Sequence, residues 1–166
     1  ASLYPAIAAD GLTVAVTWHD LRYSSDGDAF VNSSADGGQT WLSTAVQLNT
    51  GVGAVWPQVA VQGSTIHVAW QDYRNSPIGF GYTDVYVRTS TDAGQTWGPS
   101  DTRLDSDNAG FSDYTRICAS GSRVYVVWYA DESHSFITRS EDGGATWLPE
   151  QMIDTLNSDH LEIACD

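Results

Sequence analysis

The chain contains no lysine: its seven cationic residues are all arginines, and they stand against 21 aspartates and glutamates. The formal net charge is therefore -14. Such a chain lacks the basic patch that binding to nucleic acid or to an anionic membrane requires. It has no apolar run of about 18 residues, which excludes a membrane-spanning helix, and its N-terminus lacks the basic and then apolar pattern of a signal peptide.

Cysteine is also scarce. The two cysteines are too few for a disulfide scaffold, and neither they nor the four histidines have the spacing of a metal motif. The composition is otherwise 42% hydrophobic, 11% aromatic and 17% charged. These fractions exclude intrinsic disorder, and 166 residues are enough to bury a core of ordinary size.

An internal repeat is the dominant feature of the sequence. The pattern S-x-D-x-G-x-T-W occurs three times, about 50 residues apart. Its fixed positions are Ser34, Asp36, Gly38, Thr40 and Trp41; Ser90, Asp92, Gly94, Thr96 and Trp97; and Ser140, Asp142, Gly144, Thr146 and Trp147. Asp and Ser can accept backbone N–H groups in a tight turn and Gly can take a positive φ, so each copy predicts a hairpin turn.

Each repeat contains four short stretches of β-branched and aromatic residues between turn residues, and helical periodicity is absent. The expected strands are 4–9, 12–19, 28–34 and 44–49, then 56–61, 65–71, 84–90 and 101–105, then 114–119, 123–130, 135–140 and 150–154. Four antiparallel strands per repeat predict an all-β fold of β-propeller blades. The blades are 1–52, 53–108 and 109–157, and 158–166 is expected to be the first strand of a fourth blade.

The eight-residue motif resembles the Asp-box, or bacterial neuraminidase repeat, and the whole chain is similar to part of a sialidase-superfamily β-propeller. The resemblance implies that the motif is a structural turn on the face opposite the active site. It also implies a glycan-directed role, since the family includes sialidases, other glycan-acting enzymes and non-catalytic propellers. Function still has to be argued from the site itself.

Candidate ligand-binding residues gather on the expected active-site face. Asp20 and Arg22 follow the second strand of the first repeat, and Asp72, Tyr73 and Arg74 follow it in the second. An Asp–Arg pair can brace the base of each blade or bind a ligand, and the repetition favours bracing. Arg116 lies on an innermost strand, where its counterparts vary, and is the remaining candidate.

A sialidase needs an arginine cluster, a tyrosine nucleophile activated by a glutamate, and an aspartate as acid and base. Tyr114-Thr115-Arg116-Ile117 resembles the family's first arginine motif incompletely, and the tyrosine–glutamate pair cannot be assigned among the four glutamates. We therefore expect no complete catalytic set in this chain and make no assignment of catalytic residues.

Cys118 and Cys165 follow equivalent apolar positions by one and two residues, so they point to opposite faces of neighbouring blades. Two alternatives stay open: a disulfide between blade three and the start of blade four, which implies an oxidising compartment, or two buried thiols. No cofactor is expected. The loop 105–110 and Asp26-Gly27-Asp28 are weak candidates for Ca²⁺, against the alternative of solvated turn carboxylates.

The sequence thus predicts a secreted propeller segment that binds a glycan or forms part of a glycoside hydrolase. The alternative is a structural or adhesive module of a larger extracellular protein. Closed propellers have about four to eight blades, so three blades imply either self-association or the remainder of a longer propeller chain.

Overall fold

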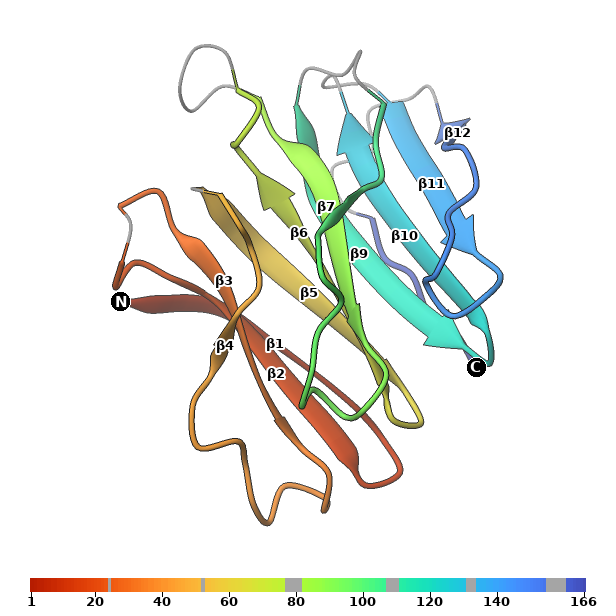
Figure 1. The fold of residues 1–166 in the computed structure, drawn as a ribbon. Coiled ribbons are helices and arrows are strands. Elements are labelled where there is room, and N and C mark those ends of the chain that lie inside the picture. Colours follow the sequence, from red (N-terminus) through yellow and green to blue (C-terminus); the bar gives the residue numbers. More distant parts are fainter. Residues whose placement is uncertain (24, 52, 77–81, 107–110, 131–133, 155–160) are drawn as a thin grey trace.

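A computed structural model describes residues 1–166 except 24, 52, 77–81, 107–110, 131–133 and 155–160. The described residues form three four-stranded antiparallel sheets and no helix (Figure 1). The strands are β1 (Ser2–Asp10), β2 (Thr13–Asp20), β3 (Asp28–Ser34) and β4 (Val46–Gln47); β5 (Ala54–Gln62), β6 (Thr65–Asp72), β7 (Asp84–Ser90) and β8 (Thr102–Arg103); and β9 (Ser112–Ser120), β10 (Arg123–Ala130), β11 (His134–Ser140) and β12 (Gln151–Asp154). The predicted β-propeller fold is confirmed.

The strand order within each sheet follows the chain, so each repeat is one blade, with β1, β5 and β9 innermost. The outermost strands β4 and β8 are shorter than predicted. Each has only two residue pairs with its neighbour. The three innermost strands lie side by side, β1 against β5 and β5 against β9 (Figure 1).

The blades pack face to face through alternate residues of their strands. One core cluster joins blades 1 and 2 around Trp70, and a second joins blades 2 and 3 around Trp128. Val59 and Ile117 point toward the preceding blade and are 8% and 9% exposed, whereas the equivalent Ile7 of blade 1 is 68% exposed. The described structure therefore has an uncovered apolar face on blade 1.

The three motif turns (34–41, 90–97 and 140–147) share one set of hydrogen bonds. The hydroxyl of Ser34 donates to Asp36 Oδ1 (2.7 Å) and accepts from the amide of Gly38 (2.8 Å). Asp36 in turn accepts from the amide and the hydroxyl of Thr40 (2.8 and 2.6 Å). Both other turns repeat these bonds. Each turn is thus closed by its own side chains.

These bonds also act on the aspartates, because a hydrogen bond to a carboxylate favours its charged form. The threonine hydroxyl, followed by the threonine amide, lowers the pKa of Asp36, Asp92 and Asp142 to about 2. The indole N–H groups of Trp41 and Trp97 donate to the glycine carbonyl of their own turn.

The second and third motif turns additionally touch the preceding blade. The hydroxyl of Ser33 in blade 1 donates to the carbonyl of Ala93 (2.8 Å), and Gly94 is so close that a Cβ there would lie 2.2 Å from Ser33 Oγ. A Cβ on Gly144 would lie 2.9 Å from Thr89 Oγ1 and 3.0 Å from the ring of His67 in blade 2. The motif glycine is therefore a contact point between blades as well as a turn residue.

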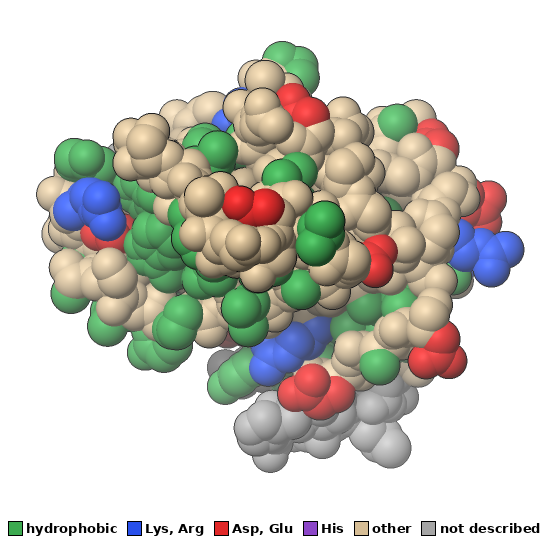
Figure 2. Space-filling model, turned by 90° about the horizontal axis from the view of Figure 1, so that it is seen from below, with side chains coloured by type: hydrophobic (Ala, Val, Ile, Leu, Met, Phe, Trp, Pro, Cys, Tyr) green, Lys and Arg blue, Asp and Glu red, His purple; other side chains and the backbone are tan. Residues whose placement is uncertain are grey.

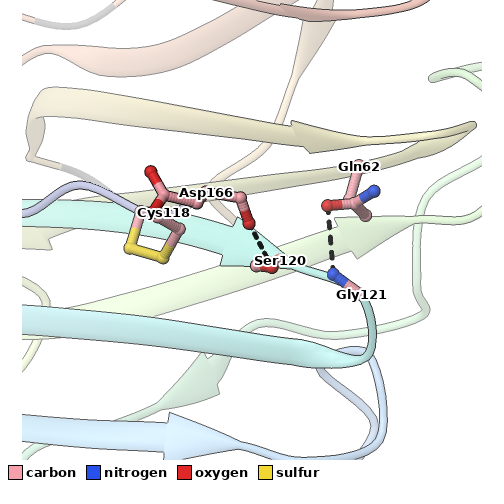
Figure 3. Close-up of a disulfide and its surroundings, with 6 residues drawn as sticks. Gln62, Cys118, Ser120, Gly121 and Asp166 are labelled. Atoms are coloured by element: carbon pink, nitrogen blue, oxygen red, sulfur yellow. Dashed lines mark hydrogen bonds between the residues drawn. A yellow bond between two sulfur atoms is a disulfide. The ribbon is translucent and has the colours of Figure 1, made fainter.

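Residues 161–166 lie along β9 but form no strand. Cys165 is disulfide-bonded to Cys118 of β9, with Cα atoms 5.7 Å apart, and the hydroxyl of Ser120 donates to the carbonyl of Asp166 (Figure 3). Among the described residues, no second strand of a fourth blade is available to pair with this segment, which is why the expected strand is not formed there.

Similar bonds link the other innermost strands. The side chain of Asp10 accepts a hydrogen bond from the backbone amide of Gly63, and the side chain of Gln62 accepts one from the backbone amide of Gly121 (Figure 3). Ser120 is the residue of blade 3 that is equivalent to Asp10 in blade 1 and Gln62 in blade 2. Because Ser120 contacts Asp166, residues 161–166 occupy the place of the next innermost strand.

Figure 2 views the molecule from the side of the motif turns. Acidic side chains are scattered singly over this face, and hydrophobic side chains gather toward the blade 1 side. No described segment forms a helix with the length and apolar character needed to cross a membrane.

Candidate functional site

Arg22, one of the arginines expected at a ligand site, is paired within its own blade. Asp20 is buried and accepts from the indole of Trp18 (2.9 Å), the backbone amide of Arg22 (2.9 Å) and the Arg22 guanidinium (2.6 Å). The guanidinium also lies 5.0 Å from the centre of the Phe30 ring. The Arg22 hydrogen bond holds the pKa of Asp20 well below its usual range, so this pair stays ionised.

Blade 2 repeats the arrangement with more partners. Asp72 accepts from the indole of Trp70 (2.9 Å) and from two guanidinium nitrogens of Arg74 (2.8 and 2.6 Å). Arg74 also contacts Asp101 at 2.7 Å and stacks over Tyr86, with its guanidinium carbon 4.1 Å from the ring centre. A guanidinium with these partners holds the base of a blade together. The geometry favours bracing over ligand binding for both Asp–Arg pairs.

A pocket of about 450 Å³ opens instead between the innermost strands; we call it the axial pocket. It is close to the N-terminal ends of β1, β5 and β9, on the side opposite the motif turns. Its lining consists of Tyr4, Pro5, Trp56, Gln58, Gln71, Asp113, Tyr114, Thr115 and Arg116. All three blades contribute to it.

Three aromatic residues at equivalent positions surround the axial pocket. Tyr4, Trp56 and Tyr114 are 57%, 37% and 51% exposed, and the rings of Tyr4 and Trp56 meet edge to face with centres 5.9 Å apart. Each residue lies in a β-bulge, where the register between the first and second strands of its blade shifts. These bulges turn large apolar side chains toward the axis instead of into a sheet face.

The backbone at these three positions is strained. Tyr4, Trp56 and Tyr114 have φ values of 51°, 46° and 53°, a left-handed conformation that is rare for bulky residues. Such a conformation costs about 1–3 kcal/mol per residue and persists only where the surroundings enforce it. Its repetition in three blades shows that the fold enforces this backbone conformation at the equivalent position of each blade.

Polar groups stand among the rings. Arg116 is the one predicted arginine that lines the axial pocket; its Nη1 donates to the carbonyl of Thr115 (3.0 Å), and its Nε lies 3.8 Å from the exposed Glu162. Gln58 holds the equivalent place on β5. Burial raises the pKa of Asp113. The pocket thus combines a cation, an amide and a carboxyl with aromatic surface.

The remaining predicted residues lie outside this lining. Tyr73 follows Asp72 and packs beside Gly53, and burial together with the nearby charge of Asp113 raises the pKa of Tyr73. The structure therefore brings Arg116 to the pocket and keeps Arg22, Arg74, Asp20, Asp72 and Tyr73 at the bases of their blades.

The structure describes only part of the two candidate calcium sites. Residues 107–110 of the loop 105–110 lie outside the described part of the chain. At the second candidate, Asp28 accepts from the amides of Gln47 and Asn49 (both 3.0 Å). Within the described residues, no group of three or more His, Cys, Asp or Glu side chains is arranged to hold a metal ion. Calcium binding stays a prediction.

Sequence reasoning missed the aromatic series of the axial pocket. The signal was present, because Tyr4-Pro5, Trp56-Pro57 and Tyr114-Thr115 stand at the same distance before the aligned apolar residues Ile7, Val59 and Ile117. Read as ordinary strand residues, these aromatics are expected in the sheet. The bulge turns these side chains toward the axis, and the residue pattern did not predict a bulge.

The described architecture is that of a β-propeller that presents a pocket at the axis. No family model matches the sequence, and no curated protein matches it. Solved structures do match in fold. A family 117 glycoside hydrolase of the marine bacterium Zobellia galactanivorans, Zg3597, is 10% identical with a TM-score of 0.64 over 96% of this chain and 58% of that protein.

Two further solved structures represent other carbohydrate-active propellers. The α-L-arabinanase of Penicillium chrysogenum is 18% identical with a TM-score of 0.59, covering 95% of this chain and 50% of that one. Trypanosoma rangeli sialidase is 15% identical with a TM-score of 0.55, covering 92% and 30%. The chain thus spans about half the length of the two glycoside hydrolases and less of the sialidase. At these identities the likeness establishes the fold.

Proposed function

We propose that the axial pocket binds a carbohydrate. The observation that carries this function is the convergence of Tyr4, Trp56 and Tyr114, each held in a strained bulge, on one pocket that also contains Gln58 and Arg116. Sugar rings present apolar C–H faces that pack on aromatic rings, and their hydroxyls pair with a few polar groups. The axial pocket offers both kinds of partner.

The fold neighbours support the same class of ligand. Their names describe a family 117 glycoside hydrolase, an arabinanase solved with arabinobiose, and a sialidase. Hydrolysis belongs to those longer proteins, and for this chain glycan binding is the function that the pocket geometry supports best. A glycoside hydrolase or sialidase activity of a longer propeller is the wider proposal.

Isothermal titration of a panel that includes arabinobiose and sialyllactose tests the proposal. Trp56→Ala removes one ring from the axial pocket, and we expect a loss of affinity of about tenfold or more, equivalent to about 1.4 kcal/mol. Trp41→Ala is the matched control, because Trp41 is exposed to a similar degree (42%) in a motif turn on the other side. Equal effects of both substitutions would refute binding in the pocket.

The alternative function is that of a non-catalytic structural or adhesive module. The Asp20–Arg22 and Asp72–Arg74 pairs favour it for the loop bases, since both arginines are engaged within their own blades. Absence of binding across the whole glycan panel, by a chain shown to be folded, would support this alternative and contradict the glycan proposal.

We further propose that the protein is secreted. The Cys118–Cys165 disulfide supports this location, because such bonds persist mainly in oxidising compartments. Mass spectrometry of the protein from its native source, with and without alkylation before reduction, would test whether the bond is present.

A further inference from the structure

Gln71 makes a contact between blades at the wall of the axial pocket. It lies on β6 of blade 2, is 2% exposed and is flanked in sequence by Trp70 and Asp72. With its amide oriented to satisfy both neighbours, Gln71 Oε1 accepts from the backbone amide of Tyr114 (2.7 Å) and Nε2 donates to Asp113 Oδ1 (3.0 Å). Both partners belong to β9 of blade 3.

The two bonds fall on the bulge that presents Tyr114. The register between β9 and β10 shifts there, since Asp113 pairs with Tyr129 while Arg116 already pairs with Val127. The bulge takes the Tyr114 amide out of the regular ladder, and a buried amide needs an acceptor. Gln71 supplies this acceptor and so stabilises the left-handed backbone of Tyr114.

The second bond orients a carboxyl group of the pocket wall. Among the described residues, the hydroxyl of Thr83 (3.3 Å) and the amide of Gln71 (3.0 Å) both donate to Asp113 Oδ1. This leaves Oδ2 to accept a hydrogen bond from a ligand hydroxyl. Blade 1 lacks such a junction: the equivalent residue is His19, whose buried ring nitrogens have no hydrogen-bond partner in the described structure.

We infer that Gln71 is the positioning residue of the axial pocket, holding the Tyr114 ring and the Asp113 carboxyl in place so that Asp113 accepts a hydroxyl of the bound ligand. This inference rests on the proposed function for the ligand. Its structural part concerns the free protein alone, and can therefore be tested without any glycan.

The test measures two properties of the free protein by NMR: hydrogen exchange of the Tyr114 amide and titration of the Asp113 carboxyl carbon. In Gln71→Leu we expect exchange faster on the order of tenfold, since one buried hydrogen bond is lost, and a further rise of the Asp113 pKa. In Gln71→Glu the acceptor remains and the donor is replaced by a like charge. Tyr114 should then stay protected while the Asp113 pKa rises.

Gln58→Leu is the matched control, because Gln58 lines the same pocket and its side-chain amide donates to the carbonyl of Pro57. Both readouts should keep their wild-type values in this variant. A folded Gln71→Leu protein with wild-type values would overturn the inference. If that variant does not fold, an unchanged Asp113 pKa in Gln71→Glu would overturn it equally.

Asp113→Asn tests the ligand contact with the glycan that binds the wild type in the panel. We expect weaker binding in Asp113→Asn and in Gln71→Leu, and unchanged affinity in either variant would overturn the role in recognition. The expected NMR results together with no glycan binding by the wild type would instead refute the proposed function and the ligand role that rests on it, leaving the positioning of Tyr114 and Asp113 established.

Discussion

Replacement of the motif glycine by alanine should have different effects in blades 1 and 2. Gly38 and Gly94 occupy the same motif position and have the same φ of 86°. An alanine at either position therefore pays the same backbone penalty, about 1–2 kcal/mol for a left-handed L-residue. The surroundings differ. The Cβ of Gly38→Ala would meet its nearest atom, in Trp41, at 3.8 Å, whereas that of Gly94→Ala would lie 2.2 Å from Ser33 Oγ.

The difference between the two variants measures the contact between blades. Ser33 is buried, and its hydroxyl is held by the carbonyl of Ala93, so it cannot move aside freely. Overpacking of this kind costs about 1–3 kcal/mol. We expect destabilisation by about 1–2 kcal/mol for Gly38→Ala and by about 2–5 kcal/mol for Gly94→Ala. Gly144→Ala, with contacts of 2.9–3.1 Å, should fall between them.

Urea unfolding followed by tryptophan fluorescence gives the comparison, as a shift of the midpoint at constant m value. Ser33→Ala in the Gly94→Ala background removes the clashing oxygen, so the double variant should recover part of the loss. If Gly38→Ala destabilised the protein as much as Gly94→Ala, the motif glycine would have no role between blades. The same conclusion would follow if the double variant showed no coupling.

Three further predictions concern other parts of the molecule. Burial lowers the pKa of His67 from 6.5 to about 4, so the unfolded chain binds the proton first and stability falls as the pH drops from 6.5 toward 4. Between pH 7 and pH 4.5, urea unfolding should show a loss of about 2 kcal/mol that is missing in His67→Gln, and equal pH slopes of the two proteins would contradict the burial argument. Cys165→Ser opens a link across 47 residues and should lower the free energy of unfolding by up to about 4 kcal/mol, while an unchanged stability would show that the bond does not constrain the chain. We also propose that copies of the chain associate through the face of blade 1, because the equivalent apolar faces of blades 2 and 3 are buried. In sedimentation equilibrium, Ile7→Asp should weaken association, whereas the control Ile153→Asp, at an equally apolar and 54% exposed residue, should not; a wild type that is monomeric at all concentrations would refute the proposal.

The blade architecture was predictable because it depends on sequence patterns within short segments of the chain. Alternation of β-branched residues identified each of the first three strands of every blade, and the S-x-D-x-G-x-T-W motif identified the turns, because the bonds that its Ser, Asp and Thr side chains make lie within eight residues. The end of the chain was less predictable. Residues 161–166 have the pattern of an innermost strand, but a strand assignment requires a neighbouring strand with which to pair.

The candidate site was predictable only in part, since it depends on how blades face one another. Arg116 was identified as a candidate from its variable repeat position, and the structure places it in the axial pocket. For Arg22 and Arg74 the repeated Asp–Arg pattern already favoured bracing over ligand binding, and the structure pairs them with Asp20 and Asp72.

The sequence by itself determined the repeat, the strands and the self-contained motif turns, because these arise from interactions between residues close in the chain. The tertiary structure alone decided that Tyr4, Trp56 and Tyr114 meet at one pocket and that Gln71 reaches the Tyr114 bulge from another blade. The physical reason is that a bulge reverses the direction of a side chain without a mark in the residue pattern, and a contact between blades joins residues about 40–60 positions apart.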